Sequence, residues 1–204
     1  MKDITNYQKL EQIFNNNKGF ITRQDVDEAN IPSWFLSDFI KRNKLQKVAP
    51  GFYADNNYVV DDYYILQRRY PKYIFSGLSA LFILDLIDKI PTDIEVSAPQ
   101  GYNPSRHKID SLIIHKISNK DIYELGIKEV STIFNNIVKT YDEERTICEI
   151  IKNRDKFDSE TFIKAVKNYV NKINNQTKLF RYARALGIEK KVYEIMEVIT
   201  NADQ

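Results

Sequence analysis

The basic side chains between residues 41 and 47 are the first feature of the sequence that could do chemistry. Lys41, Arg42, Lys44 and Lys47 stand in a run that contains no acidic residue. Cations of this kind can neutralise phosphates, and phosphate contacts supply most of the sequence-independent affinity of a protein for nucleic acid. A basic cluster is also typical of an ordinary solvated face, so the run alone leaves both interpretations open.

The run lies at the end of a predicted helix, residues 33 to about 42, that has one apolar and one polar face. The apolar face is expected to pack on other helices. The polar face carries Ser33, Ser37 and Lys41, and the two serines are short enough to let a helix approach bases. Ser33 is also expected to cap the helix. Trp34 could contact a DNA backbone, but we expect it to cover the seam between helices.

The neighbouring elements give this helix a context. A helix is predicted over residues 5–16, a short strand at Phe20-Ile21, and a brief helix from Thr22 to about Ala29. Two strands, about 45–48 and 52–54, flank an Ala-Pro-Gly turn whose residues fit type II.

The order helix, strand, helix, helix, strand, strand is that of a winged helix-turn-helix, in which the second helix of the pair enters the major groove. Residues 22–24 open the preceding helix, and we expect them to lie near a phosphate. The candidate DNA-binding residues are Thr22, Arg23, Gln24, Ser33, Ser37, Lys41, Arg42, Lys44 and Lys47.

A second domain is expected after a linker at residues 55–57. We expect an α+β chain with a winged helix-turn-helix domain over residues 1–55 and a second domain over residues 56–204. The second domain should hold a small sheet, about 93–140, followed by helices, about 143–200. Its predicted strands cover about 93–98, 111–117, 130–134 and 137–140. Its predicted helices cover about 61–70, 76–87, 143–152, 159–173, 177–186 and 189–200.

Composition bounds the class of protein. The 204 residues are 43% hydrophobic and 28% charged, with a formal net charge of +2, so any affinity for nucleic acid must come from local patches. The single cysteine excludes an intrachain disulfide and fits a reducing cytosol. The first residues lack the apolar stretch of a signal peptide, and no segment is apolar enough for a membrane helix. We therefore expect a cytoplasmic protein with no membrane contact.

Side chains for catalysis or metal binding are sparse. His107, His115 and the distant Cys148 cannot make a credible structural zinc site, and no Gly-rich phosphate loop is present. Cys148 lies among isoleucines and is expected to be a buried thiol. Asp93 and Glu95 on one strand faintly suggest a nuclease, but no lysine follows closely enough. We expect no enzymatic activity, no metal and no cofactor.

Two features of the second half remain open. Glu144-Arg145 begins a helix, and we favour an anchor between sheet and helices over a functional role. Residues 162–191 contain many cations and Glu189 as the only acid. They form either a solvated face or a second electropositive surface for nucleic acid or an anionic partner. Its candidate residues are Lys164, Lys167, Lys172, Arg181 and Arg184.

Several motifs, taken in order, resemble the AbiE-type abortive-infection antitoxins. In the first domain the likeness rests on GFITR at residues 19–23, Ile31, and the wing LQKVAPGFY at residues 45–53. In the second it rests on SAL at 79–81, IEVSAP at 94–99, ERTICE at 144–149 and YARALG at 182–187. The wing has Lys47 and Ala49-Pro50 where the family has basic residues, and Glu149 stands where an aspartate is usual.

The resemblance implies an antitoxin of a type IV toxin–antitoxin system, active in abortive phage infection, that also represses its own operon. The first domain would bind double-stranded DNA at inverted repeats in its own promoter. The second would oppose a toxin that resembles a nucleotidyltransferase, without a stable complex. The alternative is a winged-helix transcriptional regulator whose second domain senses a small molecule. A neighbouring gene for such a toxin would separate the two.

Overall fold

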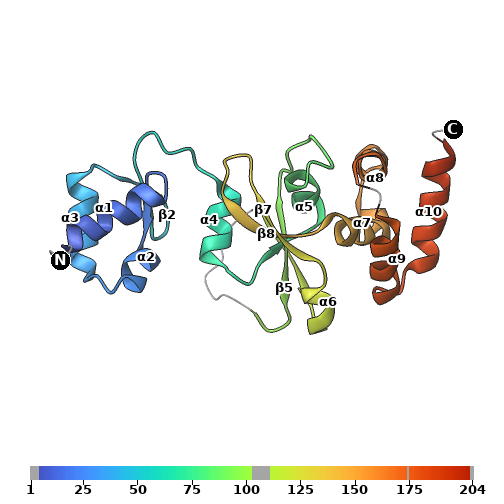
Figure 1. Ribbon diagram of the computed structural model, residues 1–204, viewed down its shortest axis with the longest axis horizontal. Helices are drawn as coiled ribbons and strands as arrows, with labels where there is room; N and C mark the ends of the chain where they lie inside the picture. The colour runs from blue at the N-terminus through green and yellow to red at the C-terminus, as the bar shows by residue number, and fades with distance from the viewer. Residues whose placement is uncertain (1–4, 103–110, 174, 203–204) are drawn as a thin grey trace. The chain divides into compact units, whose positions relative to one another are not determined.

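The protein has a mixed α+β fold, seen here in a computed structural model that describes residues 5–102, 111–173 and 175–202 (Figure 1). The chain divides into two compact units, Met1–Ile65 and Leu66–Gln204. We call them unit 1 and unit 2. His107, one of the two histidines considered for a metal site, lies outside the described residues.

Unit 1 contains three complete helices, the first residues of a fourth and a three-stranded sheet within its described part. The helices are α1 (Asn6–Asn16), α2 (Arg23–Glu28) and α3 (Ser33–Arg42). The strands are β1 (Phe20–Thr22), β2 (Gln46–Ala49) and β3 (Phe52–Ala54). Their order in the sheet is β1-β3-β2, and both pairs are antiparallel. The order of elements along the chain is the one expected from the sequence.

Local sequence explains where these elements begin and end. Thr22 and Asp25 form the expected capping box at the start of α2. Gly51 takes a φ of 79° in the tight turn between β2 and β3, a value that the third position of a type II turn requires. The expectation that Ser33 caps α3 is wrong. Ser33 is the first residue of the helix, and Pro32 occupies the cap position without a side-chain hydrogen bond.

The core of unit 1 lies between its three helices. Leu10 of α1, Val26 of α2, and Leu36 and Phe39 of α3 are all buried there, together with Ile21 of β1. The apolar face of α3 therefore packs inward, as its periodicity predicts, and the opposite face of this helix is left open.

Unit 2 is built on a five-stranded sheet. Its strands are β4 (Ile74–Phe75), β5 (Ile94–Pro99), β6 (Leu112–Ile117), β7 (Ile127–Ser131) and β8 (Ile137–Tyr141). Their order is β6-β5-β4-β8-β7. The pairs β5/β6 and β4/β8 are parallel, and β4/β5 and β7/β8 are antiparallel. Strand β4, which the sequence did not reveal, lies at the centre and joins the two halves of the sheet.

Helices before, within and after the sheet complete this part of the chain. Helix α4 (Asp62–Arg69) contains the division between the units, α5 (Gly77–Ile83) follows β4, and the unexpected α6 (Lys120–Glu124) follows β6. The C-terminal helices are α7 (Glu143–Lys152), the 3-10 turn η1 (Arg154–Lys156), α8 (Ser159–Lys172), α9 (Gln176–Ala185) and α10 (Glu189–Ala202).

Helix α7 is the central element of the C-terminal half. It contacts α5, α8, α9 and α10, and its residues Ile147, Ile150 and Ile151 are buried between them. Cys148 is fully buried in the same core, as expected, and burial raises the pKa of its thiol to about 12. Helix α7 begins directly after β8, the strand that pairs with the central strand β4. This connection holds the remaining face of α7 over the sheet.

Candidate functional site

The open face of α3 presents the residues that the sequence proposed for DNA contact. Ser33, Ser37 and Lys41 recur every four residues and are exposed. Lys44 and Lys47, just beyond the helix, are exposed as well. Within the part of the chain that the structure describes, none of these three lysines has an ion-pair partner. Five of the nine candidates are therefore exposed to solvent, three on α3 and two just after it along the chain.

Trp34 does not cover the seam between helices. Its side chain is 59% exposed, and its ring lies over that of Phe35 with 3.6 Å between centroids. The expectation of core packing is wrong because the seam is filled instead by Leu36 and Phe39. An exposed indole therefore stands beside Ser33 and Ser37 at the start of α3.

Two of the candidate arginines are engaged with aspartates of their own helix. Arg23 Nε lies 3.0 Å from Asp27, and Arg42 Nε lies 2.6 Å from Asp38. The Tyr7 hydroxyl also donates to Asp38, and this hydrogen bond is the largest influence that lowers the pKa of the Asp38 carboxyl. Both arginines remain exposed, so a phosphate could replace the aspartate, but their charges are already partly neutralised.

Thr22 is a correction to the candidate set. Its side chain is only 2% exposed, and its hydroxyl donates to Asp25 Oδ2 at 2.7 Å. The adjoining Arg23 N–H donates to the Gly51 carbonyl of the turn at 2.9 Å. Gln24 is exposed but donates to Glu28 at 2.7 Å. The start of α2 therefore serves mainly to join this helix to the β2–β3 turn.

Three of the five basic candidates in the C-terminal helices form ion pairs that the sequence did not predict. Lys164 Nζ lies 2.6 Å from Asp88, and Lys172 Nζ lies 2.6 Å from Asp85. Arg184 pairs with Glu189 at 2.8 Å. Arg181 lies over the Tyr182 ring, and Lys167 is half-buried. Asp85 and Asp88, which follow α5 and are distant in sequence, thus pair with Lys172 and Lys164. The count of acids within residues 162–191 could not reveal these partners.

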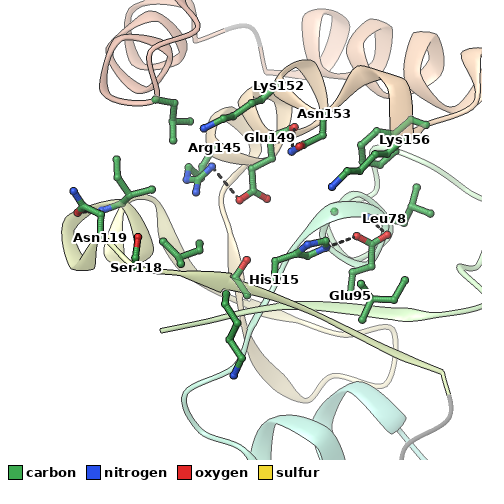
Figure 2. Close-up of a pocket in the computed structure, with 18 residues that line it drawn as sticks. Leu78, Glu95, His115, Ser118, Asn119, Arg145, Glu149, Lys152, Asn153 and Lys156 are labelled. Atoms are coloured by element: carbon green, nitrogen blue, oxygen red, sulfur yellow. Dashed lines mark hydrogen bonds and ion pairs between the residues drawn. The ribbon is translucent and has the colours of Figure 1, made fainter. Parts of the chain in front are cut away.

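A pocket of about 620 Å³ lies in unit 2 between the sheet and α7 (Figure 2). Strands β5 and β6 contribute Glu95 and His115, and α7 contributes Arg145 and Glu149. Apolar contributions come from Leu78, Ile113, Ile122, Phe157 and Leu186. Sequence reasoning named several of these residues singly but did not predict the pocket.

Two acid–base pairs face each other in this pocket. Glu95 Oε2 lies 3.0 Å from His115 Nε2, and Arg145 Nη1 lies 3.0 Å from Glu149 Oε1 (Figure 2). Burial raises the pKa of the Glu149 carboxyl, although the Arg145 charge opposes this effect. The spacing of Arg145 and Glu149 is a sequence signal for the second pair, because residues four apart lie on the same helix face. No such signal marks the first pair, whose members lie on two strands.

The Glu144-Arg145 pair has the anchoring geometry that the sequence favoured. Arg145 lies over the Tyr141 ring of β8 with 4.6 Å to its centroid. Glu144 Oε2 forms an ion pair with Lys178 Nζ of α9 at 2.8 Å. Burial acts to lower the pKa of Lys178, but its bonds to Glu144 and Asp142 outweigh burial, and the pKa is raised. These contacts tie α7 both to the sheet and to α9, which fixes the wall of the pocket.

Comparison with known proteins finds a family model that matches part of the chain and a solved structure with a similar fold. Residues 8–54 match the model of a family described as "Transcriptional regulator, AbiEi antitoxin", which confirms the resemblance found in the sequence for that segment. The crystal structure of the RV2827C protein from Mycobacterium tuberculosis is similar to the chain, with a TM-score of 0.52 and 14% identity. The similarity covers 90% of this chain and 73% of that one, and at this identity it shows the fold alone. No curated protein sequence matches the chain. Across the described residues, no helix is long and apolar enough to cross a membrane.

Proposed function

We propose that the chain is a DNA-binding antitoxin that represses its own operon, and that unit 1 is a winged helix-turn-helix domain. The match of residues 8–54 to a family of antitoxin regulators supports this assignment. The observation that carries it is the open face of α3, where Ser33, Trp34, Ser37 and Lys41 are exposed next to Lys44 and Lys47.

In this proposal α3 is the recognition helix and the β2–β3 hairpin is the wing. Ser33 and Ser37 approach base edges in the major groove, and Lys41 and Lys44 bind phosphates beside them. Lys47 extends the phosphate contacts onto the wing. Trp34 presents an apolar ring to the sugar–phosphate backbone. Arg23, Gln24 and Arg42 take part at the edge of the footprint, after exchange of their intramolecular partners. The bound sequence is an inverted repeat in the chain's own promoter.

Unit 2 supplies the antitoxin activity in this proposal. Its counterpart is a toxin that resembles a nucleotidyltransferase, in a type IV system of phage defence where no stable complex forms. The chain itself is not an enzyme, and it acts in the cytoplasm. The alternative, a regulator whose second unit senses a small molecule, is favoured by the pocket over the sheet. A toxin gene beside that of the chain supports the first proposal, and its absence favours the second.

Replacement of Lys41, Lys44 and Lys47 with alanine tests the DNA interface. Each lost phosphate contact reduces the slope of log K against log salt by about 0.9, so the slope should fall by roughly 2.7. Fluorescence anisotropy with labelled promoter DNA at several salt concentrations measures both slope and affinity. The matched control replaces Lys120, Lys190 and Lys191, exposed lysines of unit 2, and should leave the slope unchanged. Equal slopes for both triple variants would show that α3 and the hairpin do not bind DNA.

A further inference from the structure

The pocket of unit 2 has the size and lining of a site for a small molecule. Its volume of about 620 Å³ falls inside the range of roughly 300–1,000 Å³ that is usual for ligand sites. Apolar side chains line part of it, and a few polar groups converge on the rest. Strands β5 and β6 and helices α6 and α7 all contribute, together with short connections such as Ser118 and Asn119.

The inner part of the pocket favours a ligand that donates hydrogen bonds. Glu95 is 9% exposed, and its carboxylate is held by His115 on one side and the Leu78 N–H on the other. Glu149 is held by Arg145 and by a hydrogen bond from the Gly77 backbone. Each carboxylate has more lone pairs than these partners use, because an ionised carboxylate can accept about four hydrogen bonds. Hydroxyl or amino groups of a ligand would satisfy the remainder.

A buried cation adds a second unsatisfied group. Arg145 is 2% exposed and contacts Glu149 through Nη1, but its Nε has no hydrogen-bond partner within the described parts of the chain. A buried N–H without a partner costs free energy. This Nε atom is covered from solvent and does not open into the pocket, so Arg145 acts on the pocket through its ion pair with Glu149.

The outer part of the pocket favours an anion. Lys152, the last residue of α7, and Lys156 of η1 are both exposed and line the pocket on either side of Glu149 (Figure 2). Neither has an ion-pair partner among residues 5–102, 111–173 and 175–202. Each of these flexible ammonium groups at the edge of the pocket suits contact with the charge of a phosphate.

We propose that this pocket binds a phosphorylated small molecule rich in N–H or O–H groups, either a nucleotide or a sugar phosphate. The phosphate contacts Lys152 or Lys156 at the edge of the pocket, and the hydroxyl or amino groups face Glu95 and Glu149. The two carboxylates repel an anion from the inner part, so they fix this orientation. The inference concerns unit 2 alone and holds whether or not unit 1 binds DNA.

Calorimetric titration of the full chain tests the proposal. The probes are the four ribonucleoside monophosphates, ribose 5-phosphate, adenosine and inorganic phosphate. At least one phosphorylated organic probe should saturate a single site, and adenosine and inorganic phosphate should each bind at least about tenfold more weakly than that probe. Binding of a monophosphate in preference to ribose 5-phosphate identifies a nucleotide site, and the reverse order a sugar-phosphate site. Absence of saturable binding by all organic phosphates would overturn the proposal.

Two variants locate the binding. The double change Lys152→Ala and Lys156→Ala alters only exposed side chains and should raise the Kd at least about tenfold. The control, Lys190→Ala with Lys191→Ala, removes the same charge from α10 and should leave the Kd unchanged. Glu149→Gln should weaken the organic phosphate while leaving inorganic phosphate no weaker, with folding checked by circular dichroism. Equal Kd values for the two lysine pairs would place any binding outside this pocket.

Discussion

Gly77 lines the pocket next to the Glu95 carboxylate. It follows β4 with a φ of 54°, and a Cβ there would overlap the Glu95 carboxylate. The carboxylate in turn holds His115 at 3.0 Å. A side chain at residue 77 would therefore strain the backbone and also displace Glu95 from its pair.

Gly77→Ala should destabilise the protein through both effects. The left-handed backbone costs about 1–2 kcal/mol for a residue with a Cβ, and overpacking against Glu95 adds about 1–3 kcal/mol. Gly187→Ala is the matched control, because Gly187 has a φ of 68° with open space where its Cβ would lie. Urea denaturation of both variants isolates the overlap. If the two changes cost the same free energy of unfolding, Glu95 moves aside freely and does not define the pocket.

Residues with local partners were predictable, and residues with distant partners were not. The Thr22–Asp25 capping box joins residues three apart, and a residue-type rule describes it. The Lys164–Asp88 ion pair joins residues 76 apart, so the cation looked unpaired in the sequence. The same limit applies to Glu95 and His115, which meet because β5 and β6 pair in register. Trp34 was misplaced because its hydrophobicity predicts burial, while the seam has room only for Leu36 and Phe39.

At the scale of elements, the length of a helix or strand decided whether it could be predicted from the sequence. Helix α7 was predicted with its observed bounds because its apolar positions recur over several turns. Strand β4 has two residues and α6 has five, so neither shows a period. Yet β4 is the strand that joins the halves of the sheet, and α6 carries part of the pocket wall. The pocket could therefore not be predicted from the sequence, because two of the elements that support it are too short to show a periodic pattern.

The basic side of α8 gives a prediction at the same scale. Lys164→Ala with Lys172→Ala breaks the ion pairs to Asp88 and Asp85, and Asp85→Asn with Asp88→Asn breaks the same two pairs. Both pairs are exposed and screened by solvent, so each double change should alter the free energy of unfolding only slightly. If positive charge on α8 is functional, only the lysine variant should lose protection against the toxin, measured as growth during toxin expression.

Promoter binding by the same two variants separates the uses of this surface. A lysine variant that protects poorly but binds the promoter normally acts on the toxin or on its nucleic-acid target. Weakened promoter binding would instead mean that the surface extends the DNA footprint. Matching behaviour of the lysine and aspartate variants in both assays would show that Lys164 and Lys172 are structural partners only.

At the scale of the whole molecule, the division between the units falls inside α4 rather than in the polar stretch before it. Ile65 of α4 is 7% exposed and packs with Phe20, Phe52 and Ala54 of unit 1. Tyr58 and Tyr64 also contact the Phe20 ring, at 5.3 and 5.6 Å between centroids. The chain from residue 58 to residue 65 thus completes the core beneath the small sheet.

A fragment of residues 1–69 should consequently fold more stably than one of residues 1–57. The shorter fragment lacks Ile65 and both tyrosines, and loss of one such buried aliphatic residue alone costs about 2–5 kcal/mol. Chemical denaturation of the two fragments measures this difference, and promoter binding should follow it. A shorter fragment that is as stable as the longer one would show that α4 contributes nothing to the core of unit 1.

The same longer fragment tests the division of labour between the units. Residues 1–69 contain the whole proposed DNA interface but lack the pocket and the basic side of α8. The fragment should therefore bind promoter DNA, more weakly than the full chain where unit 2 adds contacts, and should give no protection during toxin expression. The full chain with the Lys41, Lys44 and Lys47 changes is the reciprocal control, since it should protect without repressing. Growth restored by residues 1–69 alone would move neutralisation into unit 1, and would leave the pocket and α8 without a part in it.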